Sequence, residues 1–406
     1  MRQRFAEWLD DVSSSEWIWL LKRLSANDTG ATGGHQVGMY VPERVIRVLF
    51  GDLAREKTKN PKRHFTVSYE STRFVDRQVV VTWYNNRNFG GTRNEFRFTN
   101  WGGKDSPIQD PEATGAACVL AFSADVRRGR HCRVWVCSGI DEEDELEARV
   151  GELTPGEPRL FFPGGDLRLS LDESAARPNP CELDPSEIPS DWLAVFPKTE
   201  EFVRASILRS GATPRELADR RLVRRRDCEY SLFLSVEREV VLPQIRRGFP
   251  SVDAFIEYSG QVMNRRKARS GRSLELQLKA IFDEEKLLFD HGKATEQKKT
   301  PDFLFPSAAA YHDHSVSADR LRMLGAKTTC KDRWRQVVTE ARRIERKHLL
   351  TLQEGVSQEQ HREMEHEGIV LVVPKPLHRH YPNSVRKKLV SLDEFIAEVR
   401  GLQRVG

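Results

Sequence analysis

Two short stretches toward the C-terminal end of the chain carry residue types that could cleave a phosphodiester. Pro301 and Asp302 open the apolar run DFLF, and Lys327 ends the run LRMLGAK after a short loop. Cleavage with a divalent metal needs carboxylate oxygens for the ion and a cation near the attacking water or the phosphate. Because two adjacent strands can bring these groups together, the spacing indicates a PD…(D/E)xK nuclease core.

One acid of that pattern is missing, because Gly325 stands two places before the lysine. Two glutamates could replace it: Glu340 flanks a helical apolar stripe in DRWRQVVTEARRIERKH, and Glu275 borders a second stripe in RSLELQLKAIF. The stripes consist of Trp334, Val337, Val338, Ala341 and Ile344, and of Leu274, Leu278, Ile281 and Phe282. We therefore expect two helices to supply acids to the site of Asp302 and Lys327.

Ordinary structural roles are open to each of these residues. Glu275 and Glu340 taken singly fit solvated helix edges, and Asp302 fits a turn or a strand end. Their convergence favours a nuclease, and a DNA-binding regulator with a degenerate nuclease fold is the alternative. The stretch YHDH also suggests a metal cluster, or Tyr311 as the nucleophile of strand exchange, but partner residues at recognisable spacing are missing for both.

Three polar residues, Lys331, Asp332 and Arg333, open the helix expected after the lysine. A helix that enters the major groove by its N-terminal end could direct Lys or Arg to guanine and Asp to cytosine, which suits a G·C-rich target. The alternative is an N-cap at Asp332 beside two solvated cations.

The N-terminal part contains RNEFRF, whose alternation places Arg93, Glu95 and Arg97 on one strand face and the phenylalanines on the other. The polar face could read a G·C step or form a salt-bridge ladder. The glycine-rich loop RLSANDTGATGGHQVGMYVP matches neither a P-loop nor a dinucleotide fingerprint. It suggests close approach of the backbone to a partner, with His35 and Tyr40 as possible contacts.

Hydrophobic periodicity divides the chain into two domains. The first has the strand patterns FTVSY, QVVVTWY, NEFRFTNW, RVWVCSG and PRLFF and the helical patterns EWIWLLKRL and PERVIRVLF, which predicts a β-rich barrel or sandwich. A stretch dense in Pro, Ser and acidic residues, between about Leu171 and Pro197, has the composition of a linker. The second has strands DFLFP, LRMLGAK, LLTLQ and GIVLVVP between longer helical patterns, which predicts an α/β domain.

Composition, charge, cysteine spacing and the length of the apolar runs limit the kinds of protein and the cellular compartments that the sequence allows. The 406 residues are 38% hydrophobic and 31% charged with net charge +5, and the basic clusters RRLVRRR and NRRKARSGR lie past the middle of the chain. The six cysteines form no CxxC pair and no zinc or disulfide spacing, so we expect reduced thiols in a cytoplasm. The apolar runs are too short for export or membrane insertion, and no membrane partner is expected.

Several longer blocks occur in order from Lys22 to beyond LTLQEGVS: KRLSANDTGATGGHQVG, TRNE, SPIQDPE, NRRKARSG, SLEL, KKTPDFLFPSA, AYHD and KTTCKDRWRQ. Together they resemble the EcoRII family of type IIE restriction endonucleases over nearly the whole chain. The resemblance implies an N-terminal B3-like DNA-binding β-pseudobarrel for residues 1–172, a linker at 173–190, and a restriction-endonuclease-like PD-(D/E)xK α/β domain at 191–406.

It also implies an activity and its partners. Such enzymes use Mg²⁺ to cut both strands of DNA before the first cytosine of 5′-CCWGG, and they need a second copy of the site bound to the N-terminal domain. Until then that domain restrains the catalytic domain. The resemblance further implies a homodimer, and a cognate cytosine methyltransferase as functional counterpart.

Site residues follow from the resemblance position by position. In this family the metal-binding acid moves to the helix thirteen residues after the lysine, which is Glu340. Asp302 and Glu340 would then hold Mg²⁺, Lys327 would be catalytic, and Glu275 would be the supporting upstream acid.

DNA contacts carry over in the same way. Readers of the CC·GG arms would be Lys331, Asp332 and Arg333, and a base flipped from the central pair would lie between Arg226 and Tyr230 with Lys267 nearby. Effector-DNA contacts would be His35, Tyr40, Arg87, Arg93, Glu95 and Arg97. The chain departs from the family pattern at Gly91 and Phe96, where basic residues are expected.

Overall fold

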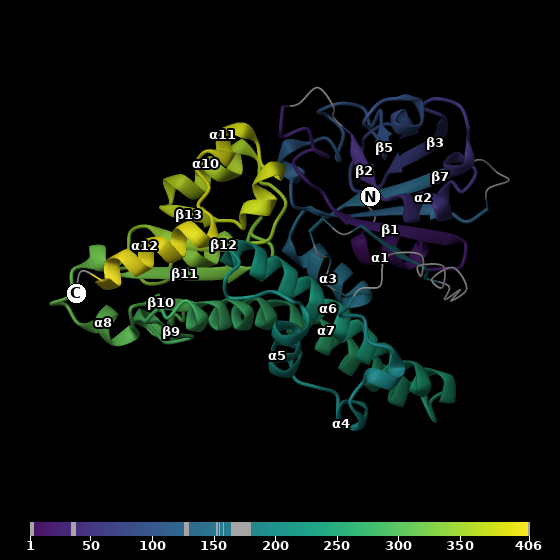
Figure 1. Ribbon diagram of the computed structural model, residues 1–406. Helices are drawn as coiled ribbons and strands as arrows, with labels where there is room; N and C mark the ends of the chain where they lie inside the picture. The colour runs from purple at the N-terminus through teal and green to yellow at the C-terminus, as the bar shows by residue number, and fades with distance from the viewer. Residues whose placement is uncertain are drawn as a thin grey trace. The chain divides into compact units, whose positions relative to one another are not determined.

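The computed structural model describes residues 4–33, 38–125, 130–151, 153, 155–156, 158–163 and 180–404 (Figure 1). The chain forms two compact units. The first comprises Met1–Ala175 with Gln353–Arg362 and His380–Lys387, and the second comprises Ala176–Leu352, Glu363–Arg379 and Lys388–Gly406. A β unit and an α/β unit are the two fold classes that the sequence predicts.

The first unit is built on an eight-stranded sheet in the order β2-β5-β4-β3-β7-β6-β1-β8. The strands are β1 (Trp17–Arg23), β2 (Met39–Val41), β3 (Lys62–Tyr69), β4 (Arg77–Tyr84), β5 (Glu95–Thr99), β6 (Ala117–Ser123), β7 (His131–Val136) and β8 (Arg159–Phe161). All pairs are antiparallel except β3 with β7. The helices are α1 (Phe5–Asp11), α2 (Glu43–Leu49) and α3 (Ile140–Val150). Alternate residues of β3, β4 and β5 point into one core, as the period of two requires.

The expected helix at EWIWLLKRL is wrong, because this stretch forms β1. Leu20 belongs to the core cluster between the sheet and α2, whereas Trp19 and Leu21 pack in a second cluster with α1 and α3. A strand that is buried on both faces has an unbroken apolar run, and such a run cannot be distinguished from a buried helix by periodicity.

The second unit is built on a five-stranded sheet in the order β13-β12-β11-β10-β9. The strands are β9 (Asp290–His291), β10 (Phe303–Phe305), β11 (Arg322–Lys327), β12 (Lys347–Thr351) and β13 (Ile369–Val372). The helices are α4 (Ser190–Ala194), α5 (Thr199–Arg209), α6 (Ala218–Arg247), α7 (Val252–Glu284), α8 (Ala308–His312), α9 (Trp334–Val338) and α12 (Leu392–Arg404). The last third of the chain also contains α10 (Gln358–His366) and α11 (Asn383–Arg386). Helices α6, α7 and α12 share one core with β10 and β11 (Figure 1).

Two helix predictions need correction. SVDAFIEYSGQVMNRRKA and RSLELQLKAIFDEEKLLF are not separate helices but parts of one 33-residue helix, α7. DRWRQVVTEARRIERKH is not one helix, because α9 ends at Val338 and the chain turns at Ala341, which has a left-handed φ of 44°. The apolar stripe is still largely buried, with Trp334, Ala341 and Ile344 inside, so the turn preserves the burial that suggested a helix.

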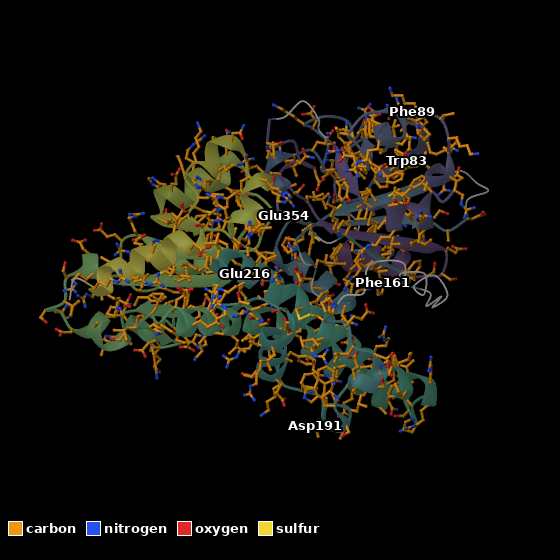
Figure 2. The ribbon with its side chains drawn as sticks, viewed as in Figure 1. Trp83, Phe89, Phe161, Asp191, Glu216 and Glu354 are labelled. Carbon is orange, nitrogen blue, oxygen red and sulfur yellow. A yellow bond between two sulfur atoms is a disulfide. The ribbon has the colours of Figure 1, made fainter. Side chains whose placement is uncertain are left out.

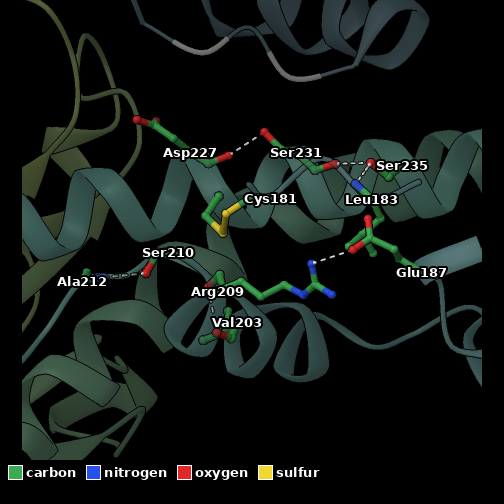
Figure 3. The surroundings of a disulfide bond; sticks show 12 residues. Cys181, Leu183, Glu187, Val203, Arg209, Ser210, Ala212, Asp227, Ser231 and Ser235 are labelled. Carbon is green, nitrogen blue, oxygen red and sulfur yellow. Dashed lines mark hydrogen bonds and ion pairs between the residues drawn. A yellow bond between two sulfur atoms is a disulfide. The ribbon is translucent and has the colours of Figure 1, made fainter. Parts of the chain in front are cut away.

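The expectation of reduced thiols is wrong for one pair of cysteines. Cys181 and Cys228 form a disulfide, with Cα atoms 5.1 Å apart (Figure 3). Cys118, Cys132, Cys137 and Cys330 are buried and are not part of a disulfide. The pair meets because Cys181, Leu183 and Ile188 pack against α6, and Ser235 Oγ accepts the Leu183 N–H at 3.1 Å. Residues 180–190 of the expected linker are therefore packed in the second unit.

Candidate active site

Strand pairing brings Asp302 and Lys327 together. Phe303 pairs with Leu324 in the antiparallel β10–β11 ladder, so Asp302, which directly precedes β10, lies opposite the end of β11. Its Oδ2 accepts hydrogen bonds from Ala326 N–H at 2.6 Å and from Lys327 Nζ at 3.3 Å. The predicted PD…K pair is thus assembled by backbone register, and one carboxylate oxygen is held by two donors.

Position 325 has no room for the missing acid. A Cβ built on Gly325 would lie 3.0 Å from Val337 Cγ2 and 3.6 Å from a methyl group of Leu349. Val337 lies on α9 and is fully buried, so it cannot yield easily. Because Gly325 and Lys327 lie on the same face of β11, α9 covers that face where an acid would otherwise stand.

Glu340 reaches the site from the end of α9. Burial and the nearby Asp302 carboxylate raise the pKa of Glu340 to about 7, although Lys327, Lys299 and Lys347 oppose the shift. The two carboxylates therefore lie near enough to repel each other, among three lysines. Glu340 thus lies near Asp302 and Lys327, in a turn and not on a helix face.

The Glu275 side chain contacts a histidine of β9. Glu275 lies on α7, whose apolar residues pack on the Leu324 side of the sheet, and its Oε2 is 3.1 Å from His291 Nε2. The His291 ring stacks on Phe303 with a centroid distance of 4.9 Å. Among the described residues there is no group of three or more His, Cys, Asp or Glu arranged to hold a metal.

Two carboxylates fit the requirements of Mg²⁺. This ion is usually held by one or two carboxylates while waters and substrate phosphates complete its octahedral shell. A cation between Asp302 and Glu340 would also remove the repulsion that raises the pKa of Glu340. We conclude that Asp302 and Glu340 could hold Mg²⁺ without a third acid.

The segment expected to read bases lies just before α9. Lys331 and Arg333 are half-buried and Asp332 is exposed, with Oδ1 of Asp332 3.5 Å from Arg335 Nη1. The alternative of an N-cap at Asp332 is wrong, because Arg333 is the N-cap residue and makes no side-chain cap. The three residues therefore lie directly between the site lysine and α9.

The residues expected around a flipped base lie on α6. Arg226 and Tyr230 are one helical turn apart, so they occupy one face. Arg226 is buried with Nη1 3.6 Å from Glu229, and the Arg269 guanidinium lies 4.7 Å from the centroid of the Tyr230 ring. Lys267 is on α7, and its side chain lies outside the described part of the chain.

The expected effector surface follows β2, β5 and the β4–β5 turn. Tyr40 is 45% exposed and pairs with Arg97 in the β2–β5 ladder. Glu95 accepts hydrogen bonds from Arg93 and, at 3.0 Å, from Arg97, so the salt-bridge ladder is present. Partial burial by itself would raise the pKa of Glu95. The two arginines outweigh this effect and hold the pKa of Glu95 below its ordinary value. Arg87 lies in the turn and donates to Thr92 O at 3.0 Å, while His35 is outside the described residues.

The structure argues against both interpretations of the YHDH stretch, the tyrosine nucleophile and the metal cluster. Tyr311 is buried and its hydroxyl donates to Glu296 Oε2 at 2.5 Å. Burial and Glu296 raise the pKa of Tyr311 to about 12, which disfavours a phenolate nucleophile at neutral pH. The metal cluster is equally unsupported among the described residues.

Two family models match the chain, the N-terminal domain of restriction endonuclease EcoRII at residues 13–164 and the EcoRII C-terminal domain at residues 233–396. Type II restriction enzyme EcoRII of Escherichia coli is 43% identical over 404 residues, which are 98% of each chain. The chain belongs to the EcoRII family. It is a restriction endonuclease, a site-specific nuclease of a family that is typically metal-dependent.

Solved structures with similar folds are more distant from this EcoRII-family chain. Metal-depleted Ecl18kI in complex with uncleaved, modified DNA is 18% identical, with a TM-score of 0.45 over 55% of this chain and 86% of that one. The complex of PspGI with substrate DNA is 15% identical, with a TM-score of 0.43 over 55% and 98%. The UbaLAI B3 domain with cognate DNA is 16% identical, with a TM-score of 0.28 over 39% and 94%.

Departures from the EcoRII-family pattern have structural reasons here. Phe96 is in the core of the first unit and stacks, with centroids 5.4 Å apart, on Trp83, which is labelled in Figure 2. A Cβ at Gly91 would lie 2.9 Å from the Cβ of Asn86. A basic side chain at position 96 would place a charge in the core, and one at position 91 would need a rearranged β4–β5 turn.

Several residues beside the site were not predicted. Lys299 and Lys347 both act on Glu340, and Glu296 holds Tyr311. Lys299 directly precedes the TPD motif, so its position in the sequence is a usable signal. Lys347 has no such signal, because it begins β12 and belongs to no motif in the sequence. No helix among the described residues is long and apolar enough to cross a membrane.

Proposed function

We propose that this chain is a type IIE restriction endonuclease that uses Mg²⁺ to cut both strands of DNA before the first cytosine of 5′-CCWGG. The observation that carries the proposal is the convergence of Asp302, Lys327 and Glu340 at the end of β11. Membership of the EcoRII family supports a type II restriction enzyme, and 5′-CCWGG is the recognition sequence that the family resemblance implies. The alternative, a DNA-binding regulator, would leave no reason to hold two carboxylates together among lysines.

Each residue of the site has a task in hydrolysis. Asp302 and Glu340 would hold Mg²⁺, which supplies Lewis acidity to the scissile phosphate when bound. Lys327 orients the attacking water and favours release of one of its protons to solvent, because its ammonium group stabilises developing negative charge. The water oxygen bonds to phosphorus while the bond to the 3′ oxygen breaks. The products are a 5′-phosphate and a 3′-hydroxyl that takes up a proton from solvent.

Recognition would come from two places in the second unit. Lys331 and Arg333 suit the O6 and N7 acceptors of guanine, and Asp332 suits the N4 donor of cytosine. Arg226 and Tyr230 would enclose a base flipped from the central pair, with Lys267 nearby. Since the site is nearly palindromic, a homodimer would present these groups to both strands.

The first unit would bind a second copy of the site through His35, Tyr40, Arg87, Arg93, Glu95 and Arg97. Binding would release the restraint that this unit places on cleavage. The functional counterpart would be a cytosine methyltransferase that protects the host copies of the sequence.

Plasmid cleavage tests the proposal. Plasmid with two CCWGG sites should be cut in Mg²⁺, and sequencing of the ends should show breaks before the first cytosine with 5′-phosphates. Lys327→Ala should slow cleavage roughly 10²- to 10⁴-fold, whereas the exposed Lys388→Ala should not. Bound but intact DNA would favour the regulator, and a protein–DNA adduct lost in Tyr311→Phe would favour strand exchange.

A fragment tests the restraint. It should begin at residue 180, because Cys181, Leu183 and Ile188 pack against α6 and a later start would remove them. We expect it to cut single-site DNA faster than the full chain. Equal rates would exclude restraint by the residues before 180.

A further inference from the structure

The turn after α9 determines where Glu340 lies. Glu340 N–H donates to Val337 O at 3.1 Å, and Ala341 then takes a left-handed φ of 44° that L residues other than Asn rarely adopt. Ala341 is fully buried. Such a conformation persists only where neighbouring groups enforce it.

The carboxylate of Glu296 makes a hydrogen bond to the backbone of this turn. Glu296 Oε1 accepts the backbone N–H of Arg342 at 2.5 Å, and its Oε2 accepts the Tyr311 hydroxyl at 2.5 Å. Partial burial by itself would raise the pKa of Glu296. These hydrogen bonds outweigh that effect and hold the pKa of Glu296 below its ordinary value. Glu296 is therefore an ionised acceptor with both oxygens in use, and hydrogen bonds to a charged acceptor are among the stronger ones.

Tyr311 and Arg343 complete the arrangement. The Tyr311 oxygen also accepts the Arg343 N–H at 3.3 Å. The Arg343 guanidinium donates to the carbonyls of Asp313 at 3.2 Å and Val316 at 2.7 Å. The residues directly after Glu340 are thus tied to the loop that follows α8.

Glu296 also belongs to the loop that leads to Asp302. Lys299 N–H donates to Glu296 O at 3.0 Å, and Thr295 N–H donates to Lys299 O at 2.7 Å, which closes the loop into a compact turn. This turn ends just before Pro301 and Asp302. The Glu296 side chain therefore connects the loop that leads to Asp302 with the backbone of Arg342, which follows Glu340.

We propose that Glu296 is a positioning residue of the cleavage reaction, which sets the separation of Asp302 and Glu340 by holding the turn after α9. The inference rests on the proposed function, since it gives Glu296 a role only if those two acids share a metal. The role of Tyr311 follows from it: the hydroxyl keeps Glu296 in place and takes no part in bond cleavage.

Magnesium dependence tests the proposal in the full-length protein. In Glu296→Gln, one oxygen acceptor and the charge are lost, so the Mg²⁺ concentration for half-maximal cleavage of two-site DNA should rise roughly 10- to 100-fold. DNA affinity in EDTA should stay unchanged. Tyr311→Phe should shift the midpoint in the same direction by roughly 2- to 10-fold. The double variant should be no worse than Glu296→Gln alone, because both changes act through one carboxylate.

Glu367→Gln, the same charge change at an exposed position, is the matched control and should keep the wild-type midpoint. A wild-type midpoint in Glu296→Gln would overturn the proposal, as would additive effects of the two variants. If Glu296→Gln fails to fold, an unshifted midpoint in Tyr311→Phe overturns it instead. Wild-type cleavage by Lys327→Ala would refute the proposed function, whereas an inactive Lys327→Ala with an unshifted Glu296→Gln refutes only the positioning role.

Discussion

Lys327 Nζ lies 3.3 Å from Oδ2 of Asp302, although 25 positions separate the two residues. The contact follows from the register of β10 on β11, in which Phe303 faces Leu324. Side chains alternate along a strand, so Asp302, Gly325 and Lys327 share the face that α9 covers. Glu340 comes close to the same two residues from the turn that follows α9.

Cleavage should require more Mg²⁺ at acidic pH. Because the pKa of Glu340 is raised to about 7 by burial and by Asp302, the carboxyl is largely protonated below that pH, and a metal must displace the proton. We expect the Mg²⁺ midpoint to rise by up to about tenfold per pH unit below 7 and to level off above it. Magnesium titrations of the cleavage rate at pH 6, 7 and 8 measure this. A midpoint that does not change with pH would contradict the assignment.

An acid returned to position 325 should not rescue the site. In Gly325→Glu combined with Glu340→Gln, the new side chain would meet the buried Val337, with a Cβ contact of only 3.0 Å. We expect no recovery of cleavage and a loss of stability of about 1–3 kcal/mol, as in other overpacked cores. The double variant and Glu340→Gln should be compared in single-turnover cleavage and in urea unfolding. Recovery of activity would show that α9 can move enough to make room for a side chain at position 325.

The sequence predicts the PD…K pair well because its signal is local. Two short apolar runs, each with one polar residue at an end, can pair in few ways. The helix faces of α7 and α12 were also predictable, since Leu274, Leu278 and Phe395 follow the helical period and are buried. Glu340 was identified as a metal-binding acid from the spacing of the family, and this role stays a prediction.

Three features of the fold depend on tertiary contacts and could not be predicted from the sequence: strand β1, the end of α9 and the disulfide. Strand β1 resembles a helix because both of its faces are buried, in two different clusters. The helix after Lys327 was predicted too long because its apolar stripe continues past Val338, whereas Ala341 turns the chain. The disulfide of Cys181 with Cys228 joins residues 47 positions apart, and no spacing rule connects them.

Stability should depend on pH through a pair of reciprocal helix caps. Asp219 Oδ1 accepts the Leu392 N–H at 2.8 Å, and Asp393 accepts the N–H groups of Ala218 at 2.9 Å and Asp219 at 3.1 Å. Burial and the hydrogen bond with Asp393 raise the pKa of Asp219 to about 7. A raised pKa means that this carboxyl stabilises the fold fully below pH 4 and loses that contribution as the pH rises to 7.

Asp219→Asn should therefore be more stable than wild type at pH 8, by on the order of 2 kcal/mol, and should lose this advantage toward pH 4. Urea unfolding across this range measures it, with Glu367→Gln as the exposed control. A stability difference that does not change with pH would show that the pair does not share a proton.

Arg97 should matter for activation and not for the chemistry. It pairs with Glu95 at 3.0 Å and lies opposite the exposed Tyr40, on the proposed effector surface. Arg97→Ala should bring the rate on two-site DNA down to the rate on single-site DNA. Arg47→Ala, an exposed arginine on α2, should keep the difference. If Arg97→Ala is still stimulated by a second site, the effector surface lies elsewhere.

In the proposed site, Glu340 has the role of the acid absent at Gly325. The most direct test of this role is single-turnover cleavage of two-site DNA in saturating Mg²⁺ by Glu340→Gln, with DNA binding measured in EDTA. We expect roughly 10²- to 10⁴-fold slower cleavage with unchanged binding, because the amide loses the charge that holds the metal. Cleavage by Glu340→Gln at the wild-type rate would contradict the account.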